Sequence, residues 1–145
     1  MWTRDKLQLR FIKEEIIPKI VEEYNIDTNK ISISGHSLAA GHSINMTLMY
    51  PGFFSAIVPI SLCRKDTSWI PSLVKTKFWI FHGDKDTVCS KSSGNDLSWW
   101  LTSAGGYSRF TVVKSDHGGT PFKVFKDYDP VSWMIKQTRG QPVVY

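Results

Sequence analysis

The chain contains 145 residues, of which 41% are hydrophobic; this length and composition indicate one globular domain and exclude an intrinsically disordered chain. The formal net charge is +5, but Lys and Arg are scattered rather than clustered, so we expect no nucleic-acid partner. No apolar run approaches the roughly 20 residues of a membrane span. The polar N-terminal residues do not resemble a signal peptide, so we expect no membrane contact and a cytoplasmic location for the chain as given.

Helices and strands are expected to alternate along the chain. The hydrophobic periodicity and the Gly and Pro positions predict, in chain order, a helix at 4–24, a strand at 30–34, a helix at 38–50, a strand at 55–62, a short helical stretch, a strand at 77–81, a helix at 91–103, a strand at 109–114 and a helix at 130–137. Pro18 should kink the first helix, and Pro59 is unusual in the middle of a strand. Apolar strands that alternate with helices predict an α/β fold, with a parallel sheet of about four strands flanked by helices, in one domain spanning residues 1–145.

Ser37 is the candidate nucleophile. The segment Gly35-His36-Ser37-Leu38-Ala39 follows a predicted strand and opens a predicted helix, which is the context of a nucleophile elbow. It keeps the first Gly and the Ser of the G-x-S-x-G motif and carries Ala39 at the last position. The turn is so tight that the neighbours of the serine must be small. The alternative is that Ser37 only caps the following helix.

The partners that a nucleophilic serine needs follow the next strands. Residues 82–86 (His-Gly-Asp-Lys-Asp) come just after the third predicted strand, and both Asp84 and Asp86 are placed to reach a histidine on the next loop. His117 comes just after the fourth predicted strand and is followed by two glycines, which let the loop double back. The order Ser, Asp, His at the carboxyl ends of successive strands predicts a catalytic triad.

These motifs resemble those of the α/β-hydrolase serine esterases. Segments 35–41, 82–86 and 116–119 carry the resemblance, which is nearest to the feruloyl-esterase-like group, with acyl-protein thioesterases and dienelactone hydrolases close by. The helix around 11–18 is similar to the one that precedes the elbow in such esterases. The resemblance implies a carboxylic ester hydrolase that acts on a small-molecule ester, with Asp86 as the catalytic acid and Asp84 shaping the turn. We expect no cofactor.

The resemblance also implies a mechanism and an incomplete sheet. An acyl-enzyme would form on Ser37, with the backbone N–H of Leu38 as one oxyanion donor. In such esterases the second donor comes from an upstream loop, and the elbow strand lies in the middle of a larger sheet. This chain resembles the C-terminal half, from the elbow strand onward. We therefore expect the free edge of strand 30–34 to pair with a missing N-terminal half or with a second copy in a homo-oligomer.

Four further residues have roles that the sequence leaves open. His36 and Trp69 are candidate substrate contacts. Alternatively, His36 only occupies a variable position of the motif, and Trp69 lies in the core or at the rim of the site. Cys63 and Cys89 lack the spacing of metal ligands, so we expect no metal site, and they can pair only if the fold brings them together. The sequence leaves two alternatives to an esterase open. One is a serine peptidase of the same fold, and the other is an impaired hydrolase that acts as an interaction module.

Overall fold

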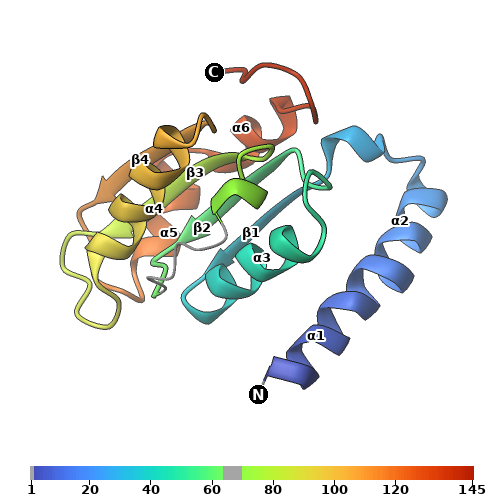
Figure 1. Cartoon of the computed structure of the whole chain (residues 1–145). Helices are drawn as coiled ribbons and strands as arrows, with labels where there is room; N and C mark the ends of the chain where they lie inside the picture. Colours follow the sequence, from blue (N-terminus) through green and yellow to red (C-terminus); the bar gives the residue numbers. More distant parts are fainter. Residues whose placement is uncertain (1, 64–69) are drawn as a thin grey trace.

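The computed structural model describes residues 2–63 and 70–145 (Figure 1). Its elements, in chain order, are α1 (Trp2–Phe11), the π-helical turn η1 (Ile12–Ile16), α2 (Ile17–Tyr24), the 3₁₀ turn η2 (Thr28–Lys30), β1 (Ser32–His36), α3 (Leu38–Met49), β2 (Ala56–Ile60), the 3₁₀ turn η3 (Ile70–Ser72), β3 (Lys77–Gly83), α4 (Lys91–Ser103), β4 (Ser108–Val113), α5 (Thr120–Asp127) and α6 (Pro130–Lys136). Among the described helices, none is long and apolar enough to cross a membrane.

Within the described residues, four strands form one parallel sheet in the order β1-β2-β3-β4. Ser32 of β1 pairs with Ala56 of β2, which also pairs with Lys77 of β3, and Phe78 of β3 pairs with Ser108 of β4. Connections between parallel strands must cross over the sheet, and here α3, η3 and α4 do so on one face, whereas α5 and α6, which follow β4, cover the other face (Figure 1). The predicted α/β fold with a covered parallel sheet is confirmed, and β1, the strand before Ser37, forms one edge of that sheet.

Two hydrophobic clusters hold the helices against the two faces of the sheet. The first joins α3 and α4 to one face and contains Ala40, Ile44, Ile57, Leu62, Ile70, Leu73, Phe78, Ile80, Leu97 and Leu101. The second joins α5 and α6 to the other face and contains Ala56, Val58, Ile60, Trp79, Phe81, Val113, Val124 and Trp133. Successive residues of β2 and β3 alternate between the clusters, as strands buried on both faces require.

Pro59 lies inside β2, where a residue without a backbone N–H is unusual. On one side it pairs in register with Gly35 of β1. On the other side, β2 pairs with β3 up to Ile57 and again from Ile60, so the ladder is interrupted beside the proline. The strand thus accommodates Pro59 by losing regular pairing with β3 over two residues.

The N-terminal helix changes its geometry just before Pro18. Residues Ile12–Ile16 form a π-helical turn, in which the N–H of Ile17 donates to the carbonyl of Ile12. Pro18 has no N–H to donate, and its ring displaces the carbonyl one turn earlier. A π-helical turn absorbs this mismatch. Where the sequence predicts a kink, the structure has a widened turn within a helix that continues on both sides.

The helix α5 was missed by the sequence analysis. It is only eight residues long, too short to display a clear hydrophobic period. Pro121 occupies its first turn, where a missing N–H costs nothing, and Val124 is fully buried in the second cluster. Pro121 just after a pair of glycines was the available signal. The other predicted helices and strands lie within two residues of their observed bounds.

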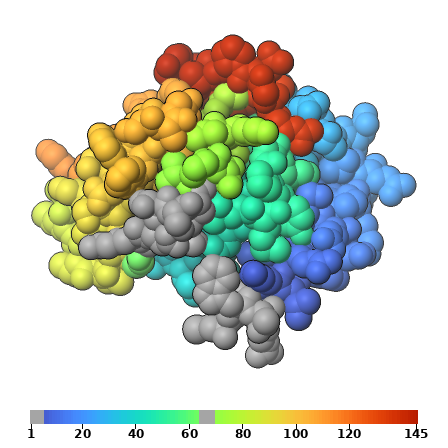
Figure 2. Space-filling model, viewed as in Figure 1, coloured from blue at the N-terminus to red at the C-terminus, as the bar shows by residue number. Residues whose placement is uncertain are grey.

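The N-terminal helix forms one side of the molecule, coloured blue at the right of Figure 2, and it packs next to β1 through Ile33. All residues of β1 are half-buried, whereas every residue of β2 and β3 is buried. Leu9 is buried in a small cluster with Met46 and Phe54. Large apolar side chains elsewhere on this helix are exposed, namely Leu7, Phe11, Ile12, Ile16, Ile20 and Tyr24. The exposed apolar surface therefore lies next to the free edge of the sheet.

Candidate active site

Ser37 lies in a sharp turn between β1 and α3. Its backbone angles, φ 57° and ψ −117°, are rare for a residue with a side chain. The turn is held because the N–H of Ser37 donates to the carbonyl of Ile60 on β2 at 2.9 Å. Such strained angles persist only where the surrounding structure fixes them, and they concentrate at functional sites. The segment therefore has the strained strand-to-helix geometry of a nucleophile elbow.

The small residues on either side of Ser37 differ in the room that surrounds them. A side chain at Gly35 would overlap the carbonyl oxygen of Ala39, so only glycine fits there. Ala39 itself is exposed, and its methyl group has room at the position where the motif usually carries glycine. The departure from G-x-S-x-G consequently leaves the turn intact.

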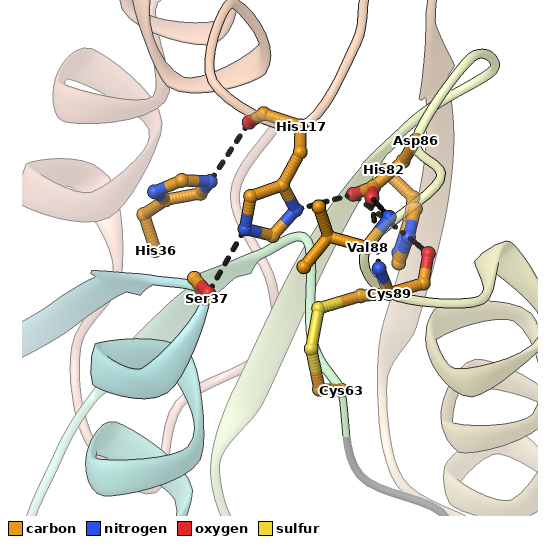
Figure 3. Close-up of a disulfide and its surroundings, with 8 residues drawn as sticks. All are labelled: His36, Ser37, Cys63, His82, Asp86, Val88, Cys89 and His117. Carbon is orange, nitrogen blue, oxygen red and sulfur yellow. Dashed lines mark hydrogen bonds and ion pairs between the residues drawn. A yellow bond between two sulfur atoms is a disulfide. The ribbon is translucent and has the colours of Figure 1, made fainter.

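His117 connects Ser37 to Asp86 (Figure 3). Its Nε2 lies 2.9 Å from Ser37 Oγ, and its Nδ1 lies 2.8 Å from Asp86 Oδ2. Because a carboxylate only accepts, the hydrogen belongs on Nδ1, and Nε2 is left to accept the hydrogen of the serine hydroxyl. The structure thus brings the three predicted residues together, with the histidine in the tautomer that a general base for Ser37 requires.

Asp86 lies in the turn that follows β3, which we call the acid turn (residues 84–90). Its side chain is fully buried. Oδ1 accepts hydrogen bonds from the backbone N–H groups of Val88 and Cys89, both at 2.9 Å. Burial raises the pKa of Asp86, but the hydrogen bonds from Cys89, His117 and Val88, together with the nearby Ser61 hydroxyl, outweigh it and lower the pKa to about 2. The carboxylate therefore stays ionised at neutral pH, as a group that orients histidine must.

Asp84 has a different place in the acid turn. Its Oδ1 accepts from the N–H of Ser115 at 2.9 Å, and its own N–H donates to the carbonyl of Val113 at 2.8 Å. A side chain at the preceding Gly83 would overlap the carbonyl oxygen of Ser115. These contacts tie the acid turn to the segment that leads to His117. Asp84 shapes the turn, and Asp86 is the carboxylate that contacts the histidine.

His36 faces the loop that carries His117. Its Nε2 lies 2.9 Å from the backbone oxygen of His117, and the centroids of the two rings are 4.7 Å apart. Because the carbonyl only accepts, this nitrogen carries the hydrogen. Burial lowers the pKa of His36. Contact with substrate stays a prediction for His36, and Trp69, the other candidate, lies outside the described residues.

The backbone N–H of Leu38 belongs to the first turn of α3, a helix of twelve residues. Donors in the first turn of a helix lack partners within the helix, and they lie at the positive end of its dipole. The N–H of Leu38 therefore lies beside Ser37 at the positive end of the α3 dipole, and its role as an oxyanion donor stays a prediction.

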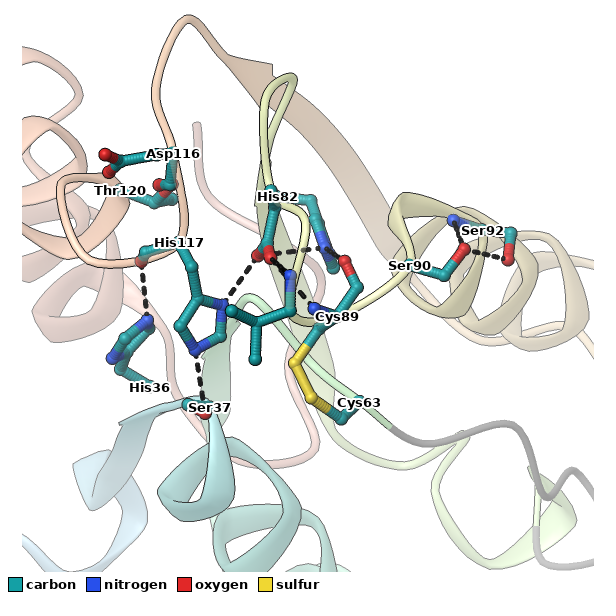
Figure 4. A network of polar contacts seen from close by, with 12 residues as sticks. His36, Ser37, Cys63, His82, Cys89, Ser90, Ser92, Asp116, His117 and Thr120 are labelled. Carbon is teal, nitrogen blue, oxygen red and sulfur yellow. Dashed lines mark hydrogen bonds and ion pairs between the residues drawn. A yellow bond between two sulfur atoms is a disulfide. The ribbon is translucent and has the colours of Figure 1, made fainter.

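Two features beside Asp86 were not predicted (Figure 4). His82 is fully buried, with Nε2 2.9 Å from the carbonyl oxygen of Cys89 and 3.3 Å from Asp86 Oδ2. Cys63 and Cys89 form a disulfide, with their Cα atoms 4.7 Å apart, that links the acid turn to the segment after β2. The cysteines are separated by 26 positions, and they meet because β2 and β3 are neighbours in the sheet. Spacing alone left this pairing open.

A parallel sheet with an elbow serine, a histidine and a buried aspartate at the ends of its strands defines the class of α/β-hydrolases. Residues 2–110 match the family described as Putative esterase, and the chain belongs to this family. No curated protein matches the chain.

Solved structures support the same class. A thermostable esterase is 29% identical with a TM-score of 0.79, and the match covers 92% of this chain and 37% of that one. The Bacillus cereus carboxylesterase is 21% identical with a TM-score of 0.67, over 90% of this chain and 60% of that one. An acylaminoacyl peptidase, solved with a chloromethyl ketone, is 14% identical with a TM-score of 0.75, over 94% of this chain and 28% of that one. The chain thus spans between about a quarter and three fifths of the length of these proteins.

Proposed function

We propose that this chain carries the catalytic triad of a serine esterase, which cleaves a small-molecule carboxylic ester through an acyl-enzyme. The observation that carries the proposal is the unbroken row of hydrogen bonds from Ser37 Oγ through His117 to Asp86. A role for Ser37 as a helix cap has no support, because its side chain makes no capping hydrogen bond to α3.

The geometry allows both halves of the reaction to use the same groups. Ser37 Oγ attacks the carbonyl carbon of the ester while its proton passes to Nε2 of His117. The ester C–O bond then breaks, and the alkoxide leaves with that proton as an alcohol. Water attacks the acyl-serine in the same way and releases the acid. Asp86 holds the imidazole through Nδ1–H and stabilises its charged form in both steps.

The negative charge on the tetrahedral oxygen needs donors that are already in place. The N–H of Leu38 is one, since it follows the nucleophile and opens α3. We propose that a second donor comes from an upstream loop of the complete fold. Losing one such donor typically costs about 10²–10³ in kcat, so the 145-residue chain alone should hydrolyse activated esters slowly.

We propose that the free edge of β1 is covered by an N-terminal half like that of the longer relatives. The half-buried residues of β1 and the exposed apolar face of the N-terminal helix support this proposal, as does the limited share of each relative that the chain spans. An unpaired strand edge beside apolar surface favours association. Light scattering over a concentration series should show self-association of the isolated chain. A stable monomer would contradict the proposal, whereas a discrete dimer would favour a second copy as the occupant.

A serine peptidase of the same fold is the second candidate, because an acylaminoacyl peptidase shares this fold. The esterase family match favours ester substrates. The third candidate, an impaired hydrolase that acts as an interaction module, is less well supported because all three triad groups remain in contact.

Hydrolysis of p-nitrophenyl acetate, compared with a p-nitroanilide peptide, tests the proposal. The chain should release p-nitrophenol above background, Ser37→Ala should remove this activity, and the anilide should be a poorer substrate. Equal turnover by Ser37→Ala would contradict the assignment, and preferential cleavage of the anilide would favour the peptidase. Ser43→Ala is a matched control, because Ser43 is buried in α3 and donates to the carbonyl of Ala40 rather than to His117.

A further inference from the structure

Cys89 is in direct contact with the proposed catalytic acid through its backbone. Its N–H donates to Asp86 Oδ1 at 2.9 Å, and this bond is the largest of the interactions that favour the ionised carboxylate. A residue that holds one oxygen of Asp86 also determines how the other oxygen meets His117. The position of Cys89 therefore influences the orientation of the histidine.

Two side chains hold Cys89 in place from different directions (Figures 3 and 4). Its sulfur is bonded to Cys63, which follows β2 and is anchored through the pairing of that strand with β3. Its carbonyl accepts a hydrogen bond from Nε2 of His82, at the end of β3. The His82 ring is fully buried, packs beside Gly94 of α4, and also lies 3.3 Å from Asp86 Oδ2. The acid turn is thus tied to two strands and one helix.

We propose that Cys89 is a positioning residue for the catalytic acid, and that its disulfide with Cys63 makes catalysis sensitive to reduction. The inference rests on the proposed function, in which Asp86 is the acid of the triad. The inference goes beyond the triad, because it makes the position of Asp86 depend on a covalent bond that a Ser-His-Asp triad does not itself need. In the reduced protein the N–H of Cys89 loses its covalent anchor, and Asp86 holds His117 less firmly.

The chemical step is thiol–disulfide exchange with a dithiol reductant. A thiolate of the dithiol attacks the disulfide, and its second thiolate resolves the mixed disulfide. The dithiol becomes a cyclic disulfide, while Cys63 and Cys89 gain two electrons and two protons and become thiols. Cys63 is exposed whereas Cys89 is 2% exposed, so the bond is approached from the side of Cys63.

The consequence depends on the surroundings of the protein. In an oxidising compartment the bond would remain closed and act as a permanent brace, whereas a reducing cytosol would open it. The cytoplasmic location stays a prediction. If it holds, the disulfide would be open there and the activity would be the lower one of the reduced protein.

The test compares the oxidised full chain with the same preparation after complete reduction by dithiothreitol. Hydrogen exchange of residues 86–89, followed by mass spectrometry, reports the bonds from Val88 and Cys89 to Asp86 without any need for activity. On reduction this segment should exchange at least about tenfold faster. The kcat for p-nitrophenyl acetate should fall roughly ten- to a hundredfold, as expected when a catalytic group is misplaced by about 1 Å. KM should stay within about twofold, and reoxidation should restore kcat.

The control variant is Cys63→Ser, which lacks the disulfide but keeps Cys89. It should resemble the reduced protein and show no response to dithiothreitol. Unchanged hydrogen exchange of residues 86–89 or an unchanged kcat after complete reduction would overturn the inference. Faster exchange throughout the chain would overturn it too, because the disulfide would then stabilise the whole fold rather than position Asp86. If the oxidised chain shows no Ser37-dependent activity, the proposed function fails, and the exchange of residues 86–89 still decides whether the disulfide positions Asp86.

Discussion

The acid turn and the β1 side of the sheet are built in opposite ways. In the acid turn, the side chain of Asp86 is fully buried, and both of its oxygens have partners, Oδ1 within the turn and Oδ2 on His117. On the β1 side, the strand is half-buried and the helix before it exposes apolar residues such as Leu7 and Phe11. Ser37 lies where these two regions meet.

The difference separates the contacts that the described residues make among themselves from the apolar surface that they leave exposed. The contacts that orient the histidine arise within the chain, between segments that follow successive strands. The apolar surface beside β1 is typical of an interface that other strands would cover. We conclude that the triad geometry is self-contained, whereas the burial around the nucleophile strand is incomplete. The following predictions test this contrast.

The largest expected effect on kcat comes from substitution of Asp86, the proposed catalytic acid. Asp86→Asn keeps the shape of the side chain but removes the charge that stabilises His117 during the reaction. Loss of a triad carboxylate costs up to about 10⁴ in kcat. The measurement is the rate of p-nitrophenyl acetate hydrolysis at saturating substrate.

Asp84→Asn is the matched control for this change. Asp84 accepts from Ser115 and shapes the turn, so its loss should reduce kcat far less than the loss of Asp86. If Asp84→Asn proves the more damaging substitution, the two carboxylates have been assigned in the wrong order.

The same contrast explains what the sequence could predict. Ser37, Asp86 and His117 follow three strands whose apolar character is visible in the sequence, and the parallel sheet brings such positions to one edge. The other contacts around Asp86 could not be predicted in this way. His82 directly follows the predicted strand 77–81 without any pattern of its own, and the disulfide depends on the register between β2 and β3. Contacts between distant segments leave no local periodicity.

The next effect concerns the tight turn at the nucleophile. Gly35→Ala introduces a methyl group that would overlap the carbonyl of Ala39, so we expect a loss of about 3 kcal/mol in the free energy of unfolding. Gly41→Ala is the control, because a side chain there meets nothing within 4 Å, and alanine in a helix should stabilise by about 0.5 kcal/mol. Urea denaturation of both variants measures the difference. Similar stabilities for the two would show that the elbow is less tightly packed than described.

A third prediction concerns the pH dependence of stability. The pKa of Asp86 is about 2 in the folded protein and about 3.9 in an unfolded chain. Because the folded value is the lower one, the stabilisation is fully present above about pH 4 and is lost as the pH falls through 2. It amounts to about 2.5 kcal/mol. Urea denaturation at pH 5 and pH 2 measures this effect. Between the two pH values, the free energy of unfolding of the unsubstituted chain should fall by about that amount more than the free energy of unfolding of Asp86→Asn. Equal losses would mean that the carboxylate gains nothing from its hydrogen bonds.

The smallest effects are expected on the N-terminal helix. Leu9 is 8% exposed and packs with Met46 and Phe54, so Leu9→Ala should cost about 2 kcal/mol. Phe11 is 57% exposed, so Phe11→Ser should change stability by no more than about 0.5 kcal/mol while reducing self-association. Thermal unfolding and light scattering measure the two properties. A large destabilisation by Phe11→Ser would show that this surface is already packed in the isolated chain.

The central claim, that Ser37 is the nucleophile of a working triad, is tested most directly by labelling with a fluorophosphonate. Such a probe reacts with a serine hydroxyl only when a base activates it. Mass spectrometry of the digested, labelled chain should place the adduct on the peptide that contains Ser37, and labelling should slow strongly in Asp86→Asn. An adduct on another serine, or labelling that survives Ser37→Ala, would contradict the account.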